Sequence, residues 1–227
     1  MIVPIGDPKI KTMYFITFLR HGESESNAKG VLQGQLDYPL SSIGLDQAKR
    51  LAIYWKAHGQ CFDLIISSPL QRASSTATII ADYLKVPIEY DATWKERSFG
   101  QLQGEHLDEI RQYNPPVDFF HPYNPIGCNG ESQLDLFMRA GLALQNILRY
   151  PTGAYLVVSH GGILNKALYV IMGITPQGHY SSPIFHFTNL GYAQFHYNPA
   201  SRQWAVLSLN NQIRTDQGEG PDFWKID

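Results

Sequence analysis

The sequence predicts an α/β fold, a three-layer α/β/α sandwich with a mainly parallel sheet, an antiparallel edge and an inserted cap segment. Short apolar runs alternate with longer helical patterns through much of the chain, and parallel strands need such crossovers. Toward the C-terminus, short apolar runs are instead joined by turn residues, as in hairpins and edge strands. Between residues 101 and 130, four prolines and several aromatic residues interrupt the pattern, which is typical of an insertion over the sheet.

The individual elements follow from the spacing of apolar residues along the chain. Residues 1–12 contain two prolines and a glycine, so we expect a loose N-terminal extension. The apolar run at 13–19 predicts a buried strand. Residues 41–58 predict a helix, because a serine can cap its start and Gly59 can end it. The other strands are expected at 62–66, 86–90, 154–158, 184–188, 192–197 and 204–209, and the other helices at 72–84, 131–149 and 163–172.

The composition is that of an ordinary globular chain. Its 227 residues suit one hydrophobic core, so we expect a single domain over 1–227 with the cap inserted at about 101–130. A net charge of -2 offers no basic excess for nucleic acid, which argues against that class of partner. No apolar run approaches the roughly 18 residues that span a bilayer, and we find no secretory signal. Cys61 and Cys128 are isolated, as in a reduced compartment. We therefore expect a cytoplasmic protein without a membrane partner; a homodimer is left open.

Residues suited to catalysis follow four of the predicted strands, at the point where each strand ends. Because the carboxyl ends of parallel strands meet at one edge of a sheet, where α/β proteins bind ligands, we expect these residues to converge. They are Arg20 and His21 after the first run, Arg72 after the second, Glu96 after the third and His160 after the fourth.

Each of these residue types suits phosphoryl transfer. A neutral imidazole is a good nucleophile near pH 7, because its ordinary pKa is about 6.5. Arginine presents a planar fork of donors to phosphate oxygens and keeps its charge. Gly22 and Gly161 allow backbone N–H groups to approach an anion closely. A glutamate beside the leaving oxygen can act as a general acid.

The motifs around these residues resemble the histidine phosphatase superfamily, also called the phosphoglycerate mutase-like family. The strings LRHGES, SSPLQRA, GES and VSHGG occur in the order typical of that family. The resemblance extends from about residue 14 to residue 190. The matching segments are 19–24 with Asn27, 32–34 with Asp37, 39–41 with Gly44, 67–73, 96–97 with 99–100 and 102–104, 130–132, and 158–162.

The resemblance implies a role for each residue. His21 would be phosphorylated, while Arg20, Arg72 and His160 would hold the phosphoryl group. Glu96 would protonate the leaving group and later activate water. The phosphate pocket would be lined by Asn27, Gln33, Gly34 and Gly161, although Asn27 and Gln33 also fit plain turn positions. The family implies no metal and no cofactor, and the sequence shows no metal-ligand spacing.

Three functions are compatible with this group of residues. The first is a metal-independent phosphatase that hydrolyses small phosphomonoesters, and the second is a cofactor-dependent phosphoglycerate mutase. Mutases of the family carry extra basic residues in the insert, where this chain has only Arg111, which favours hydrolysis. The third is a non-catalytic module that binds a phosphorylated ligand, which the presence of all five catalytic residue types argues against. The substrate stays open among sugar phosphates, nucleotides, a cobalamin-precursor phosphate and phosphorylated proteins.

Overall fold

A computed structural model describes residues 12–177 and 183–210, and these residues form a six-stranded sheet. The strand order is β3-β2-β4-β1-β5-β6. The first four strands along the chain pair in parallel, and β5 and β6 form the antiparallel edge. The strands are β1 (Tyr14–Arg20), β2 (Leu64–Ser67), β3 (Ile88–Tyr90), β4 (Ala154–Ser159), β5 (Tyr192–Asn198) and β6 (Gln203–Asn210).

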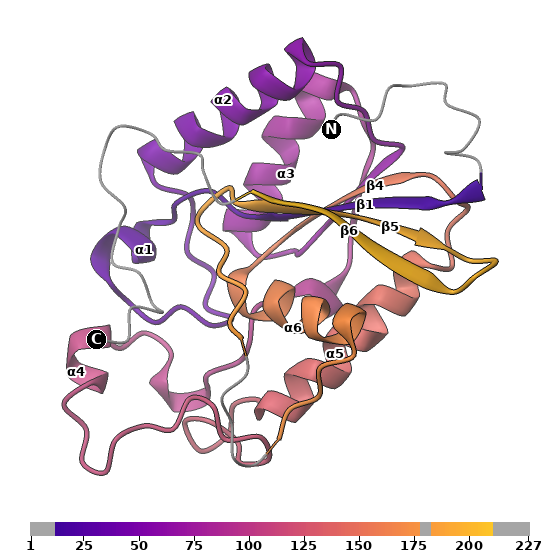
Figure 1. Cartoon of the computed structure of the whole chain (residues 1–227). Helices are drawn as coiled ribbons and strands as arrows, with labels where there is room; N and C mark the ends of the chain where they lie inside the picture. Colours follow the sequence, from indigo (N-terminus) through magenta and orange to yellow (C-terminus); the bar gives the residue numbers. More distant parts are fainter. Residues whose placement is uncertain (1–11, 178–182, 211–227) are drawn as a thin grey trace.

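Helices cover both faces of the sheet, so the predicted three-layer sandwich is confirmed (Figure 1). On one face α2 packs against α3, and on the other face α5 packs against α6. Two shorter helices, α1 and α4, lie to one side of these layers. The bounds are α1 (Glu25–Lys29), α2 (Ser42–Ala57), α3 (Gln71–Leu84), α4 (Leu107–Ile110), α5 (Gln133–Ile147) and α6 (Gly161–Met172).

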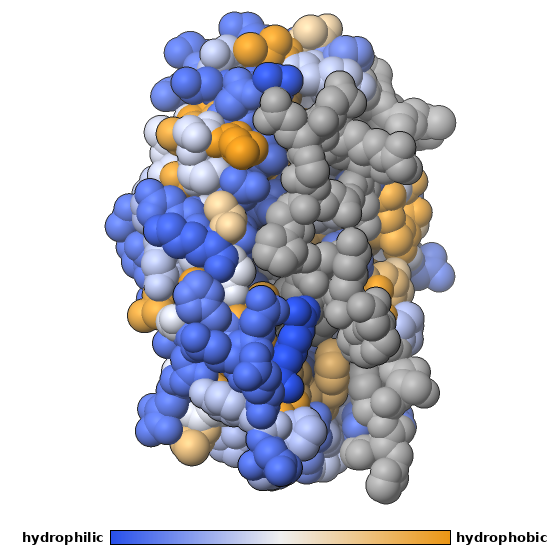
Figure 2. Space-filling model, turned by 90° about the vertical axis from the view of Figure 1, so that its left-hand side faces the viewer, coloured by the Kyte–Doolittle hydropathy of each residue, from blue (hydrophilic) through white to orange (hydrophobic). Residues whose placement is uncertain are grey.

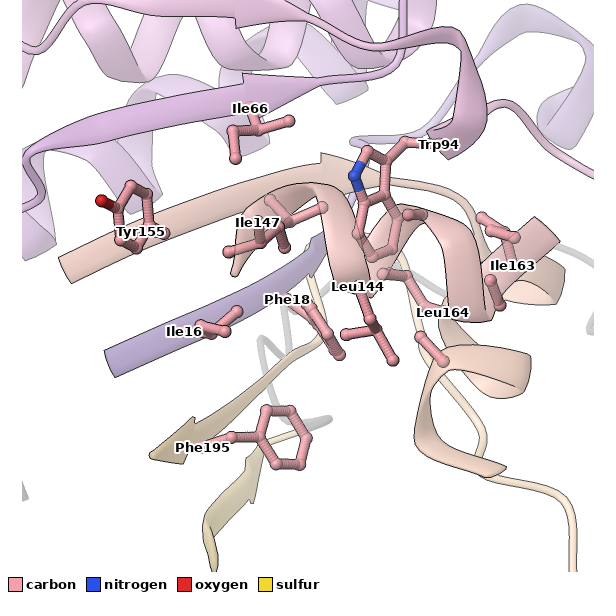
Figure 3. Packing of buried hydrophobic residues seen from close by; sticks show 14 of the residues in the cluster. Ile16, Phe18, Ile66, Trp94, Leu144, Ile147, Tyr155, Ile163, Leu164 and Phe195 are labelled. Carbon is pink, nitrogen blue, oxygen red and sulfur yellow. The ribbon is translucent and has the colours of Figure 1, made fainter. Parts of the chain in front are cut away.

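Two apolar cores lie on opposite faces of the sheet. On the α5–α6 face, the Phe18 ring contacts Trp94 and Phe195, with centroids 5.6 and 5.1 Å apart (Figure 3). The next residue, Leu19, joins Trp55 in the core beneath α2 and α3. Because Phe18 and Leu19 enter opposite cores, both faces of β1 are buried and the strand is mostly apolar. Figure 2 shows the left-hand side of the molecule as drawn in Figure 1, and the described residues on this side are mainly hydrophilic, with apolar residues scattered among them.

Local signals set where the two long predicted helices begin. The Ser41 side chain accepts from the backbone N–H of Gly44, 3.0 Å away, and thereby caps α2. Ser132 caps α5 in the same way and exchanges hydrogen bonds with Asp135, which forms a capping box. The α5 helix therefore begins at Gln133, two residues later than the expected start at 131.

The expected strand at 184–188 is wrong, because these residues form neither a helix nor a strand. In this part of the chain, backbone carbonyl oxygens accept hydrogen bonds from side chains of α6 instead of from a neighbouring strand. Asn165 donates to the carbonyl oxygen of Phe185, and Tyr169 donates to that of Pro183. Both sides of β1 are already paired, one with β4 and the other with β5, so no position beside β1 is left for this segment.

Other differences are smaller. Strand β3 covers only Ile88–Tyr90 of the expected 86–90, since Pro87 has no N–H to donate to a ladder. The short helix α1 has no counterpart among the expected elements. The expected N-terminal extension lies, apart from Thr12, outside the described residues.

The segment expected to form the cap packs on a small apolar core of its own. Phe99, Leu102 and Ile110 are buried there together with Leu32, which follows α1. Phe119 packs against this cluster, so at least one of the cap aromatics covers the base of the cap. Tyr113 and Tyr123 are exposed instead.

Two helical glycines provide a matched test of how tightly the loop after β1 packs on α2. A Cβ atom on Gly44 of α2 would lie 2.0 Å from the carbonyl oxygen of Glu23, whereas one on Gly141 of α5 would lie 4.0 Å from its nearest neighbour, Val170. We predict that Gly44→Ala lowers the free energy of unfolding by about 1–3 kcal/mol through overpacking. Gly141→Ala should raise it by about 0.5–1 kcal/mol through helix propensity. Urea unfolding measures both values, and equal stabilities of the two variants would contradict this packing.

Candidate active site

The candidate site lies where the parallel strands of the sheet end. The last residue of β1, Arg20, pairs with Ser159, the last residue of β4. His21 and His160 follow directly, so their rings come within 5.0 Å of each other, measured between centroids. Arg72 reaches the same place from the first turn of α3, which follows β2. The convergence expected from the sequence is therefore present for these four residues.

His21 is buried, with 3% of its surface exposed, and one of its ring nitrogens is held by the backbone. Its Nδ1 lies 2.7 Å from the carbonyl oxygen of Gly22. Because a carbonyl oxygen only accepts, Nδ1 carries the proton and Nε2 keeps its lone pair. Burial, with the positive charges of Arg72 and Arg20, holds the pKa of His21 well below its ordinary value. The ring is thus neutral at pH 7 and has a nucleophilic Nε2.

His160 is fully buried and bonded through both ring nitrogens. Arg72 donates from Nε to His160 Nδ1 at 3.2 Å, so the proton of the neutral ring is on Nε2, which lies 2.8 Å from the hydroxyl of Ser68. The other guanidinium nitrogens of Arg72 donate to the carbonyl oxygens of Leu36 and Gly34, at 2.8 and 2.7 Å. Burial lowers the pKa of Arg72 to about 10 and holds that of His160 well below its ordinary value.

Arg20 brings a second guanidinium to the two histidines. It donates from Nη1 to the carbonyl oxygen of Phe187 at 2.6 Å. Gly161 flanks it, since a Cβ atom there would lie 3.8 Å from Arg20 Nε. The charge of Arg20 lowers the pKa of both His21 and His160, so both rings lie within its field. The site is positive, as an incoming phosphate group requires.

Glu96 reaches the same site from an irregular loop that follows a short 3-10 helix at Ala92–Trp94. Its two carboxylate oxygens accept from the backbone N–H groups of Arg97 and Gly162, at 2.7 and 3.0 Å. A Cβ atom on Gly162 would lie 2.4 Å from this carboxylate, so only glycine leaves room for it. Glu96 also acts electrostatically on Arg72. All five predicted catalytic residues are therefore near one another.

The predicted phosphate-pocket residues Asn27 and Gln33 meet at Ser24, the N-cap of α1. The Ser24 hydroxyl lies 2.9 Å from Asn27 Oδ1 and 3.0 Å from Gln33 Oε1. The backbone N–H of Ser24 also donates to Asn27 Oδ1, at 3.2 Å. Since an N–H only donates, the carbonyl end of the Asn27 amide is fixed there, and its NH2 end faces the opposite way.

Asn189, which was not among the predicted site residues, connects two parts of the site. Its Nδ2 donates to the carbonyl oxygen of His21 at 3.0 Å and lies 3.4 Å from Asn27 Oδ1. No motif marked Asn189, because it follows the apolar run that we interpreted as a strand. Thr76 was missed as well, although its hydroxyl accepts from the backbone N–H of Gly22 at 3.1 Å. It lies just beyond the SSPLQRA string, which does contain Ser68.

Three further features concern residues 12–177 and 183–210. No group of three or more His, Cys, Asp or Glu side chains in these ranges is arranged to hold a metal ion. No helix within them combines the length and the apolar character needed to cross a membrane. Cys61 and Cys128 are both free thiols.

Comparison with known proteins gives consistent matches. Residues 16–212 match the model of the histidine phosphatase superfamily, branch 1. The chain is 35% identical to "Uncharacterized phosphatase PhoE" of Bacillus subtilis, over 73% of this chain and 81% of that protein. It is 30% identical to "Putative phosphoserine phosphatase 2" of Hydrogenobacter thermophilus, over 92% and 99%. It is 34% identical to "Probable phosphoglycerate mutase GpmB" of Escherichia coli, over 71% and 76%. The solved structure of Bacillus stearothermophilus YhfR superposes with a TM-score of 0.75, at 27% identity, over 88% and 98%.

The two buried histidines predict how stability depends on pH. In the unfolded chain each takes up a proton near pH 6.5, whereas in the folded chain each stays neutral to lower pH. The unfolded state therefore binds more protons below pH 6.5. We predict that the free energy of unfolding falls by about 1.4 kcal/mol per pH unit for each histidine as the pH decreases from about 6.5.

Urea unfolding between pH 7 and pH 5.5 measures this slope. His21→Asn should remove about half of it, and the double variant with His160→Asn should remove nearly all of it. A slope that persists unchanged in the double variant would show that other groups cause the pH dependence.

Proposed function

The chain belongs to branch 1 of the histidine phosphatase superfamily, and we propose that it is a phosphatase that hydrolyses small phosphomonoesters through a phosphohistidine on His21. One observation carries the proposal. The neutral His21 ring donates its Nδ1 proton in a hydrogen bond to the Gly22 carbonyl oxygen, which leaves the Nε2 lone pair available beside two guanidinium groups. The relatives named as phosphatases support the same activity.

In the first step, His21 Nε2 attacks the phosphorus atom and the bond from phosphorus to the ester oxygen breaks. The Glu96 carboxyl gives its proton to that leaving oxygen. Positive charge develops on the phosphorylated ring, and the Gly22 carbonyl faces the Nδ1–H that carries part of it. Arg20 and Arg72 neutralise the phosphoryl oxygens, and His160 completes the wall around them.

In the second step, water replaces His21 on the phosphorus atom. The Glu96 carboxylate takes a proton from the water as its oxygen attacks, and the bond between phosphorus and Nε2 breaks. Inorganic phosphate leaves, His21 returns to its neutral form, and Glu96 is protonated for the next turnover. Asn27, Gln33, Gly34 and the Gly161 backbone line the phosphate pocket in this proposal.

The substrate is a small phosphomonoester, and two guanidinium groups compensate its charge without a metal ion or other cofactor. The relative named as a phosphoserine phosphatase makes phosphoserine the first compound to test. The scarcity of basic residues in the cap favours hydrolysis over mutase activity, because Arg111 is the one lysine or arginine between residues 101 and 130. Its side chain is exposed on the surface and paired with Asp108 at 2.9 Å.

The phosphorylated intermediate can be trapped directly. After rapid quenching of a reaction with radiolabelled phosphoserine, we predict acid-labile, alkali-stable label on His21, with phosphate release unaffected by a chelator. His21→Ala should carry no label, because the attacking nitrogen is lost. Wild-type protein without label, or His21→Ala with full label, would contradict the mechanism.

The role of Glu96 predicts a dependence on the leaving group. An alkyl phosphate needs a proton on its leaving oxygen, whereas p-nitrophenolate leaves without one. We predict that Glu96→Gln lowers kcat/KM for phosphoserine by about 100-fold or more, and lowers it far less for p-nitrophenyl phosphate. Equal losses for the two substrates would mean that Glu96 is not the general acid.

A further inference from the structure

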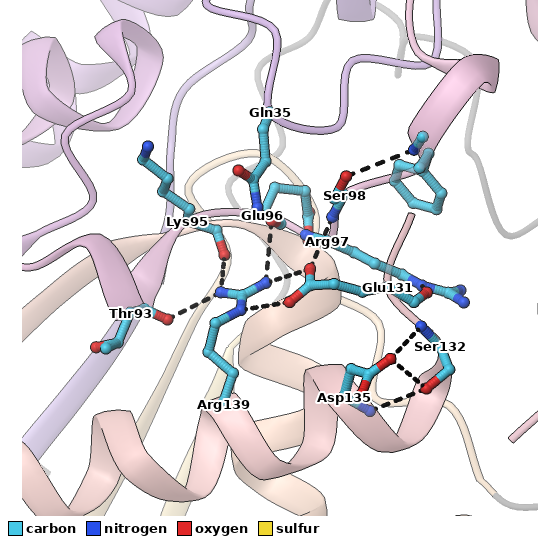
Figure 4. A network of polar contacts seen from close by, with 12 residues as sticks. Gln35, Thr93, Lys95, Glu96, Arg97, Ser98, Glu131, Ser132, Asp135 and Arg139 are labelled. Atoms are coloured by element: carbon cyan, nitrogen blue, oxygen red, sulfur yellow. Dashed lines mark hydrogen bonds and ion pairs between the residues drawn. The ribbon is translucent and has the colours of Figure 1, made fainter. Parts of the chain in front are cut away.

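A partly buried ion pair lies behind the site, between Arg139 of α5 and Glu131 just before that helix (Figure 4). Arg139 donates from Nε and Nη2 to the two carboxylate oxygens of Glu131, each at 2.7 Å. Only 18% and 20% of these side chains are exposed, in contrast to the surface ion pairs of the chain. This planar, two-point contact is specific to arginine.

The pair is also bonded to the backbone of the loop that carries Glu96. Arg139 donates from Nη1 to the carbonyl oxygens of Thr93 and Lys95, at 2.9 and 2.6 Å, and from Nη2 to that of Glu96, at 3.1 Å (Figure 4). Arginine has five N–H donors, and these three bonds with the two to Glu131 use all of them.

Glu131 holds the other side of the same loop. Its Oε2 accepts from the backbone N–H of Ser98 at 2.8 Å, so the pair contacts the chain both before and after Glu96. Residues 95–99 form no helix or strand, and their position depends on such contacts. Gln35 adds a second donor to the Glu96 carbonyl, at 3.0 Å.

We propose that Arg139, together with Glu131, is a positioning residue that places the Glu96 carboxyl at the leaving oxygen. This inference rests on the proposed function, which assigns the proton transfer to Glu96. A partly buried ion pair adds little net stability, because desolvation offsets its attraction, so stability alone does not account for it. An error of about 1 Å in the position of a catalytic group can cost roughly 100-fold in rate, and Arg139 prevents such an error.

The test compares substrates with poor and good leaving groups in Arg139→Met. We predict that kcat/KM for phosphoserine falls by about 100-fold, while kcat/KM for p-nitrophenyl phosphate falls by only a few fold. Glu131→Gln keeps the shape of the side chain and should give the same selective loss of kcat/KM for phosphoserine, by a smaller factor. It also tests the proposal if Arg139→Met does not fold.

The Glu96→Gln background separates positioning from a general structural role. Without a carboxyl to place, Arg139→Met should add no selective loss for phosphoserine. Arg50→Met is the matched control, since Arg50 pairs with Asp46 at 2.6 Å on the exposed side of α2 and should leave both substrates unaffected.

Equal losses on both substrates in Arg139→Met, or the same selective loss when Glu96 is already glutamine, would overturn the positioning role while Glu96 keeps its own. If Glu96→Gln itself shows no selectivity between the substrates, the assignment of Glu96 as the general acid is overturned, and the role of Arg139 with it.

Discussion

The buried guanidinium of Arg72 is the constraint around which the site is arranged. Only 1% of its surface is exposed, and an unpaired charge at that depth would cost several kcal/mol. Its bonds therefore connect three segments: α3, which carries it, the loop carbonyls of Gly34 and Leu36, and His160 after β4. Removing its donors would leave buried acceptors on two of these segments.

The same charge sets the chemistry of its neighbours. Burial, together with the charges of Arg72 and Arg20, holds the pKa of both imidazoles low and keeps them neutral, which is the form of His21 that the proposed mechanism needs. Two positive charges beside two neutral rings attract an anion, so the phosphate group of a substrate would complete the site electrostatically. Neutral, buried histidines lower the stability of the fold at acidic pH. The unfolded chain takes up protons on His21 and His160 that the folded chain does not, so the free energy of unfolding falls.

Loops supply what the sheet does not. The strands place His21 and His160 through their register, but Glu96 lies in an irregular segment and depends on Arg139 and Gln35. The segment before β5, expected to be a strand, instead brings the Phe187 carbonyl to Arg20 and Asn189 to the backbone of His21. An apolar run cannot reveal whether its carbonyl groups will meet another strand or the side chains of a helix.

By itself, the sequence determined the family, through short contiguous strings, and the three-layer fold, through the alternation of apolar runs and helical patterns. It also marked five residues that the structure brings near one another. Only the tertiary structure decided which nitrogen of His21 carries the proton, how the Asn27 amide is turned, and what holds the Glu96 loop. The physical reason is that hydrogen bonds decide these features. Several of their partners, such as Asn189 for His21 and Arg139 for Glu96, are far apart in the chain, and no local pattern records such pairs.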